Sequence, residues 1–128
     1  MAEPIVTEQY IGSLYVVEIV QTDASPGDIF EVEASPPISG TIVRMDVVKS
    51  SGPATLLVPG MFYQDPTGFA NEDEVRIIGG LTGGPTSFGD SDRVTYARPG
   101  WDGKFWLRNE PDAGPGNVIR TRIHIEAR

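Results

Sequence analysis

Short runs of β-branched and aromatic residues, separated by turns rich in glycine and proline, constrain this chain more than any other feature of its sequence. Turn sequences such as SPGD, SPPISG, SSGP, DPTG and PDAGPG recur at intervals of roughly ten residues. The 15 glycines and 11 prolines therefore punctuate strands and do not form one low-complexity segment. No stretch has the apolar spacing of an amphipathic helix. The pattern predicts an all-β fold.

Eight segments have the composition of β-strands. They are Leu14–Gln21, Ile29–Ala34, Thr41–Lys49, Ala54–Tyr63, Glu74–Gly79, Arg93–Ala97, Lys104–Asn109 and the closing stretch VIRTRIHIEAR. A chain of 128 residues with this spacing predicts a single-domain antiparallel β-sandwich, jelly-roll-like, over residues 14–128. Residues 1–13 contain Pro4 and Gly12 and precede the first of these strands, so we expect an N-terminal arm, either frayed or laid along a neighbour.

Apolar residues keep one parity within most of these segments, which assigns them to the inward face of a sheet. The expected inward rows are Tyr15, Val17 and Ile19; Phe30, Val32 and Ala34; Val43, Met45 and Val47; Phe105 and Leu107; and Ile119, Ile123 and Ile125. The run Leu56–Val58 is apolar without alternation, so we expect it to be covered on both faces or to lie at an interface. Pro59 has no backbone N–H, which predicts a bulge or bend there.

Charge is distributed unevenly along a chain whose net charge is -8. Residues 1–43 hold acids and no Lys or Arg, whereas the last strand directs Arg120, Arg122 and His124 away from its apolar face. Two interpretations stay open: the terminal strands adjoin in one sheet and their outward rows pair, or the acids of one subunit meet the bases of the next. In either case the expected partners are acidic rows such as Glu31 and Glu33. An acidic chain with no run of bases excludes a nucleic-acid partner.

Composition also excludes several classes of site and location. No apolar run approaches the roughly 18 to 20 residues of a membrane-spanning helix. The acidic N-terminus MAEPIVTEQY differs from an export signal, so a soluble protein of a cytoplasm, or of a virus particle assembled there, is expected. The absence of cysteine excludes disulfides, thiolate metal sites and cysteine nucleophiles.

Candidate catalytic and metal-binding residues are few. His124 is the single histidine and lies on an outward row, so a catalytic triad is not expected. The acids at 72–74, with Asp90 and Asp92, lie in polar loops with nothing nearby to raise one pKa, and DPTGFANEDE lacks the spacing of a calcium-binding EF-hand loop. GGLTGG does not match a phosphate-binding loop. We therefore expect no enzymatic activity, no metal and no cofactor.

The aromatic residues give a stronger signal for binding. Tyr96, Trp101 and Trp106 fall within YARPGWDGKFW, and Trp106 shares its outward parity with Lys104 and Arg108. These aromatics could anchor a protein interface, pack within the sandwich, or stack on sugar rings. The glycine-rich stretch Gly79–Asp92 is too long for a simple hairpin, and long loops on a rigid scaffold often carry binding sites.

Taken together, the acidic cysteine-free all-β composition, the arm, the Gly/Pro-rich loop, KFWLRNEPDAGPGN and VIRTRIHIEAR resemble the small virion proteins of tailed bacteriophages. Capsid decoration, or cement, proteins are the nearest group. The resemblance is architectural and transfers no functional residue. It implies a structural virion protein that binds the major capsid protein on the outer capsid surface, as a homo-oligomer with a trimer favoured. The alternative is a tail-fibre or baseplate module that binds host glycans. The candidate interface residues are Trp101, Trp106, Arg108, Arg120, Arg122, His124, Glu31 and Glu33.

Overall fold

A computed structural model of the chain describes residues 3–33, 40–79, 86–88, 94–96 and 104–127. This part of the chain consists of strands, turns and two short 3-10 helices, and contains no α-helix. The strands are β1 (Ile5–Ile11), β2 (Leu14–Ala24), β3 (Ile29–Glu33), β4 (Gly40–Ser51), β5 (Gly60–Phe62), β6 (Arg76–Gly79), β7 (Thr86–Phe88), β8 (Val94–Tyr96), β9 (Lys104–Arg108) and β10 (Asn117–Ala127). The 3-10 helices are η1 (Pro66–Gly68) and η2 (Glu72–Glu74). The predicted all-β class is confirmed.

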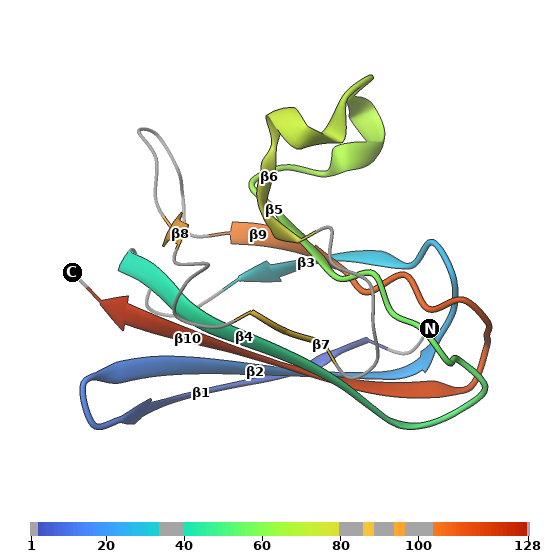
Figure 1. The fold of residues 1–128 in the computed structure, drawn as a ribbon, viewed down its shortest axis with the longest axis horizontal. Coiled ribbons are helices and arrows are strands. Elements are labelled where there is room, and N and C mark those ends of the chain that lie inside the picture. Colours follow the sequence, from blue (N-terminus) through green and yellow to red (C-terminus); the bar gives the residue numbers. More distant parts are fainter. Residues whose placement is uncertain (1–2, 34–39, 80–85, 89–93, 97–103, 128) are drawn as a thin grey trace.

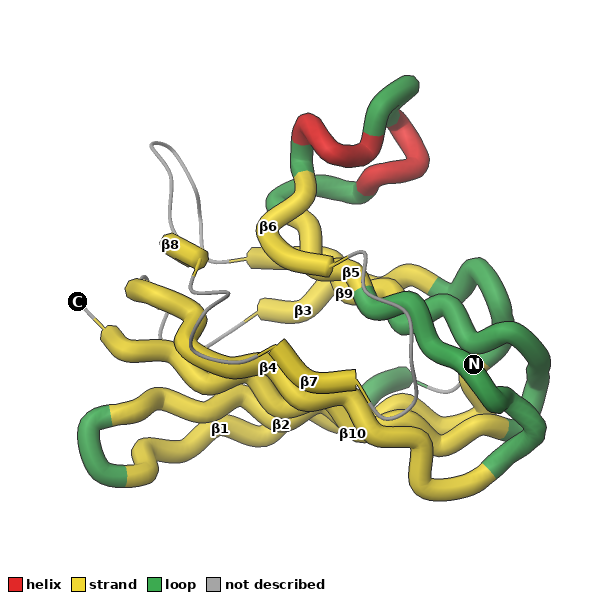
Figure 2. Tube along the Cα trace, viewed as in Figure 1, coloured by secondary structure: helices red, strands yellow, loops and turns green. Residues whose placement is uncertain are grey.

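The strands form two antiparallel sheets that lie in two layers (Figures 1 and 2). The first sheet has the order β1-β2-β10-β4-β7, and β8 also pairs with β4. The second sheet has the order β3-β9-β5-β6. The chain alternates between the sheets from β2 to β5 and again from β8 to β10, so, apart from the consecutive pairs β1–β2 and β5–β6, neighbours within a sheet are distant in sequence.

A shared core fills the space between the sheets. The inward rows of β2, β4 and β10 in the first sheet meet Val32, Met61, Phe105 and Leu107 of the second. Side chains such as Ile19 and Leu107 are completely buried, and each such burial stabilises the fold by about 1.5–3 kcal/mol before entropic costs. The rows predicted for β2, β9 and β10 are confirmed. Phe30 is only partly buried against the core, and Ala34 lies outside the described residues.

A bulge in β4 changes which residues reach the core. The pairing of β4 with β10 shifts between Arg44, opposite His124, and Ile42, opposite Ile125. Ile42 therefore joins Met45 and Val47 in the core row, and the neighbouring Val43, expected in that row, is the extra residue of the bulge. Val43 is nevertheless buried.

The segment that precedes β5 forms less strand than the sequence predicts. Of the expected strand Ala54–Tyr63, only Gly60–Phe62 pairs continuously, and it begins directly after Pro59. The preceding residues lie beside the chain after β9: the Val58 amide donates to the Asn109 carbonyl at 3.0 Å, and Leu57 forms an isolated bridge with Pro111. Leu57 is buried but Leu56 is exposed, so Leu56–Val58 is not covered on both faces, and its alternative place at an interface stays a prediction.

Residues near the N-terminus form a strand of the first sheet, whereas the sequence suggested an arm over residues 1–13. β1 pairs with β2 along its whole length, from Ile5 opposite Val20 to Ile11 opposite Leu14. Gly12 and Ser13 connect the two strands, and Gly12 adopts a φ of 61°, which a two-residue hairpin turn requires and glycine allows without strain. β1 lies at the outer edge of the sheet.

Buried polar side chains tie the connecting segments to the core. Asn109 donates through Nδ2 to Gln21 and to the Thr121 hydroxyl at 3.2 Å. Asn117 is fully buried where β10 begins: its Oδ1 accepts from the Ala54 amide, and its Nδ2 donates to the carbonyls of Ala24 and Ala113. The Asn117 side chain thus satisfies backbone groups of three residues that would otherwise lack these partners.

Candidate functional site

The described residues among the predicted interface candidates lie on the outer faces of two different sheets. Arg120, Arg122 and His124 belong to β10 and lie on the outer face of the first sheet. Trp106 and Arg108 of β9 lie on the outer face of the second sheet, as do Glu31 and Glu33 of the adjacent β3. The structure therefore separates the basic row of β10 from Glu31 and Glu33, and within one chain these groups do not meet. Trp101 lies outside the described residues.

Within the chain, the basic row of β10 meets acids of the first sheet, so its predicted intramolecular pairing with Glu31 and Glu33 is wrong. β10 pairs with β2 and places Arg122 opposite Glu18. The Arg122 Nε lies 2.6 Å from the Glu18 carboxylate, and the Arg120 Nε lies 3.8 Å from it. This arrangement confirms that the N- and C-terminal parts of the chain adjoin in one sheet and pair their outward charges.

His124 lies beside a second group of charges on the same face. Its Nε2 is 3.8 Å from the Asp46 carboxylate of β4. The same carboxylate forms an ion pair with the Arg44 Nε at 2.8 Å. Burial lowers the pKa of His124, and the positive charges of Arg44 and Arg122 lower it further, against the opposing effect of Asp46. The lowered pKa favours the neutral form of His124, and the permanent positive charges of the β10 row are those of the two arginines.

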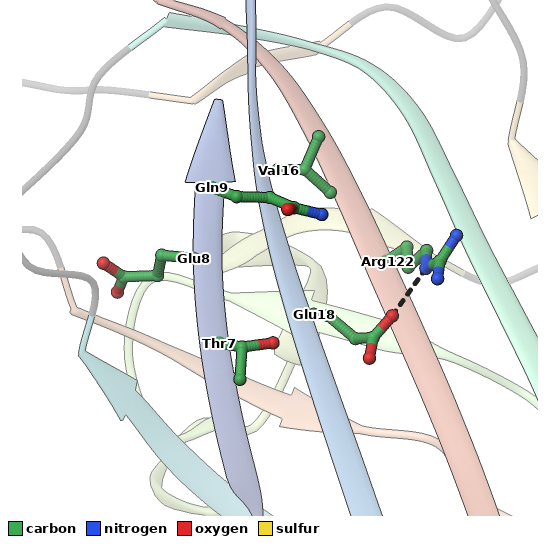
Figure 3. Close-up of a pocket in the computed structure, with 6 residues that line it drawn as sticks. All are labelled: Thr7, Glu8, Gln9, Val16, Glu18 and Arg122. Atoms are coloured by element: carbon green, nitrogen blue, oxygen red, sulfur yellow. Dashed lines mark hydrogen bonds and ion pairs between the residues drawn. The ribbon is translucent and has the colours of Figure 1, made fainter. Parts of the chain in front are cut away.

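A shallow depression of about 180 Å³ lies where β1, β2 and β10 adjoin (Figure 3). Its lining residues are Thr7, Glu8, Gln9, Val16, Glu18 and Arg122. Figure 3 shows the Thr7 and Gln9 side chains directed toward Glu18 and Arg122, whereas Glu8 is directed to the opposite side. The Thr7 hydroxyl, the Gln9 amide and the Glu18–Arg122 ion pair can donate hydrogen bonds to a polar side chain of a partner and accept them from it.

The outer face of the second sheet is partly covered by the chain between β5 and β6. Phe62 is completely buried on this face, with the guanidinium groups of Arg76 and Arg108 at 5.2 and 5.1 Å from its ring centre. The ring also lies over Gly60, where a Cβ atom would come within 2.8 Å of it. Only glycine allows this close approach.

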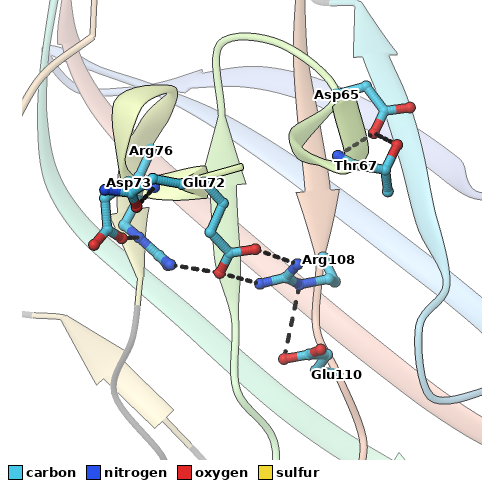
Figure 4. Close-up of polar contacts among 8 residues, drawn as sticks. Asp65, Thr67, Glu72, Asp73, Arg76, Arg108 and Glu110 are labelled. Carbon is cyan, nitrogen blue, oxygen red and sulfur yellow. Dashed lines mark hydrogen bonds and ion pairs between the residues drawn. The ribbon is translucent and has the colours of Figure 1, made fainter. Parts of the chain in front are cut away.

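Glu72 of η2 links this covering segment to the sheet (Figure 4). It accepts two hydrogen bonds from Arg108, both at 2.9 Å, and one from Arg76 at 2.8 Å. The hydrogen bonds from Arg108 hold the pKa of the Glu72 carboxyl below its usual value, and the charge of Arg76 acts in the same direction. Arg108, predicted as an interface residue, is thus engaged within its own chain.

The rest of this outer face is more open. Trp106 is half-buried, opposite Glu31 on one side and Phe62 on the other. Glu31 is exposed and lies 3.4 Å from the Lys104 ammonium group, and Glu33 is exposed as well. Trp106 therefore has the outward direction that its parity predicted.

Sequence reasoning did not single out Glu18, Arg44 or Asp46, which are the partners of the β10 row. Their outward direction could be read from parity. Glu18 has the parity opposite to the inward row of Tyr15, Val17 and Ile19, and Asp46 has the parity opposite to Met45 and Val47. Which of several outward acids adjoins β10 depends on strand order, which parity does not give.

Comparison with known proteins does not extend this description: no protein-family model, no curated protein and no solved structure matches the chain. In the described part of the chain, no helix is long and apolar enough to cross a membrane. The same residues contain no group of three or more histidines and acids placed to hold a metal ion.

Proposed function

We propose that this chain is a non-enzymatic structural virion protein, a capsid decoration protein that binds the outer surface of a phage capsid through the outer face of its first sheet. The observation that carries the proposal is the open row of charged side chains on this face. Arg44, Arg120 and Arg122 are each more than half exposed there, and Asp46 and Glu18 are their ion-pair partners.

The physical chemistry of this face suits docking on another protein. Side chains of both signs, held by ion pairs on long neighbouring strands, can match a complementary pattern and fix its register. Each contact is weak alone because exposed ion pairs contribute little, roughly 0–1 kcal/mol. A regular shell presents many equivalent sites, and linked copies would gain avidity from binding several of them.

We further propose that the two sheets form a sandwich of the jelly-roll type. The orders β2-β10-β4-β7 and β3-β9-β5-β6 support this. They are obtained when one long ribbon of antiparallel strand pairs, β2 with β10, β3 with β9, β4 with β7 and β5 with β6, is wrapped across two facing sheets. Such a fold leaves broad sheet faces for contacts with neighbours. The phage location, the major capsid protein as partner and the trimer rest on the resemblance in sequence.

Co-sedimentation with shells assembled from the major capsid protein encoded in the same genome tests the docking face. Arg122→Glu should weaken binding. The exchanged pair Glu18→Arg with Arg122→Glu should also weaken it, because the exchange keeps the internal ion pair but reverses the pattern that the shell meets. Lys104→Glu, on the outer face of the second sheet, is the matched control and should bind normally. Normal binding by the first two variants, with folding checked by circular dichroism, would reject this docking face.

One observation favours a second candidate, a glycan-binding module of a phage tail fibre or baseplate. Trp106 presents part of its ring beside exposed Glu31, an arrangement in which an aromatic face could stack on a sugar and a carboxylate could accept from its hydroxyls. Screening the chain and its Trp106→Ala variant on a glycan array distinguishes the two. Glycan binding that is lost in this variant, without shell binding, would replace the first proposal with the second.

A further inference from the structure

β1 is an edge strand with an unusual number of exposed apolar side chains. Among the described residues, six large apolar side chains are exposed, and four of them lie on β1: Ile5, Val6, Tyr10 and Ile11, at 37% to 63% exposure. The other two, Val48 and Leu56, lie on separate segments. Within the described chain β1 pairs with β2 alone, so the backbone groups along its other side are available to a further strand.

The other edge strands of the two sheets lack this combination. β7 and β8 have three residues each, and β6 has four. β3 has five residues and carries exposed Glu31 and Glu33. Short length and charge are the usual protection of an edge against pairing with another chain. β1 has seven residues and a single charge, that of Glu8, so it is the least protected edge.

The sequence of β1 is symmetric in residue type about Glu8. In IVTEQYI, Ile5 corresponds to Ile11, Val6 to Tyr10 and Thr7 to Gln9. An antiparallel pair of two such strands, centred on Glu8, places like with like: apolar residues opposite apolar residues and amide opposite hydroxyl. This is the self-complementarity that a two-fold interface between identical subunits requires.

We propose that β1 pairs antiparallel with β1 of a second copy of this chain, around a two-fold axis at Glu8, so that the first sheets of two chains join into one continuous sheet. Ile5, Thr7, Gln9 and Ile11 lie on the outer face, because they are opposite Val20, Glu18, Val16 and Leu14. There each Ile5 would contact Ile11 of the second copy, and each Thr7 would contact Gln9 of the second copy.

On the other face, Val6 would pack on Tyr10 of the second copy. Tyr10 is already oriented by an edge-to-face contact with Tyr15 of its own chain, with ring centres 5.2 Å apart. The Val6 and Tyr10 side chains lie on the same face as Tyr15, Val17 and Ile19, with Glu8 between them, so this pairing would add apolar contacts to that face on both sides of the axis. Cross-strand pairs of aromatic and β-branched residues are among the more favourable in antiparallel sheets.

Glu8 gives the proposal a distinctive signature. At the centre of the pair, the two Glu8 carboxylates would lie opposite each other, and like charges directly opposite weaken a strand pair. Glu8→Gln keeps the size and removes the charge, so it should tighten the dimer by roughly two- to five-fold. A dimer formed through any other surface would not respond in this way.

This inference does not depend on the proposed function, because it concerns contact between copies in the absence of a shell. It replaces the trimer expected from the resemblance with two-fold symmetry, because a trimer needs a head-to-tail contact between two different surfaces. Light scattering coupled to gel filtration, applied to the full chain, measures the result directly. We expect a concentration-dependent dimer.

Two matched double variants test the contribution of β1. Ile5→Lys with Ile11→Lys should give a monomer, since it places charges at both ends of the strand pair. Val48→Lys with Leu56→Lys changes two exposed apolar residues elsewhere and should remain a dimer. Circular dichroism confirms that each variant is folded. A monomeric wild-type chain, a trimer, or a dimer that survives the β1 variant would overturn the proposal.

Single cysteines test the register, because the chain contains no cysteine of its own. Glu8→Cys should form a disulfide-linked dimer readily under mild oxidation, since each Glu8 is opposite its counterpart. Thr7→Cys and Gln9→Cys should form it slowly, because each is opposite the other residue type. Leu56→Cys controls for non-specific oxidation. Faster cross-linking at residue 7 or 9 than at residue 8 would reject pairing centred on Glu8.

Discussion

Asn117 connects three parts of the chain that are far apart in sequence, through both ends of its amide. Its oxygen accepts from the Ala54 amide at 2.9 Å, and its nitrogen donates to Ala24 at 2.8 Å and to Ala113 at 2.7 Å. A buried side chain that both donates and accepts cannot be replaced by a purely accepting one without leaving carbonyls unpaired.

Replacing Asn117 by Asp should therefore lower the free energy of unfolding by about 2–4 kcal/mol, as measured by urea denaturation. Asn71→Asp is the matched control. Asn71 uses its side-chain oxygen to accept from the Asp73 amide at the start of η2, and a carboxylate can do the same. We expect a change within about 0.5 kcal/mol at that site. Equal losses in the free energy of unfolding at both positions would show that the hydrogen bonds donated by the Asn117 amide do not contribute to stability.

The residues of the charged row on β10 show how far sequence reasoning extends at this scale. The two-residue period correctly gave the outward direction of Arg120 and Arg122. It did not identify their partner, because Glu18 is 104 residues away from Arg122 in sequence. The prediction of Glu31 and Glu33 followed from charge alone, and charge does not specify which strands are neighbours.

At the scale of elements, the segment between β5 and β6 is held on the second sheet mainly by Arg108. Its guanidinium binds Glu72 and lies over Phe62, and its side chain is largely buried. Inside the segment, the Tyr63 amide donates to the Val75 carbonyl at 2.8 Å, which closes the base of the loop. Loss of Arg108 would leave η2 without its main contact to β9.

Arg108→Ala should accordingly accelerate amide hydrogen exchange in residues 63–75 and lower the free energy of unfolding by about 1–3 kcal/mol. Arg120→Ala removes an arginine of similar charge from an exposed ion pair of 3.8 Å, so it should change stability by no more than about 0.5 kcal/mol and leave this exchange unaltered. Exchange rates in 63–75 that respond equally to the two variants would contradict this assignment.

β1 and β4 show which properties of an element the sequence did not reveal. β1 was expected as part of an arm because residues 1–13 precede the first predicted strand and contain Pro4 and Gly12. Its place in the sheet comes from its hairpin with β2. The bulge in β4 exchanges Val43 for Ile42 in the core row, and two adjacent β-branched residues carry no local signal for which one is displaced.

At the scale of the whole molecule, the two sheets share one core, so neither sheet is expected to be stable alone. Met45 of β4 and Leu107 of β9 lie in opposite sheets, and both are completely buried. Their side chains belong to the same cluster of core residues. Truncating either one should weaken the entire molecule.

Met45→Ala and Leu107→Ala should each lower the free energy of unfolding by about 2–5 kcal/mol. In both variants, far-ultraviolet circular dichroism, which reports on all strands, and tryptophan fluorescence, to which Trp106 of the second sheet contributes, should give coincident urea transitions. Two separated transitions, or a shift in only one signal, would show that the sheets unfold independently.

The sequence by itself determined the all-β class, the approximate location of the strands other than β1, β5 and β7, and the inward rows of β2, β9 and β10. These follow from local physics, because side chains alternate between faces and glycine and proline interrupt strands wherever they occur. Only the tertiary structure decided the strand order, and with it the pairing of Arg122 with Glu18, the packing of Phe62 between two arginines and the exposed edge of β1. Those contacts join residues distant in sequence, and their energies depend on which strands become neighbours when the shared core forms.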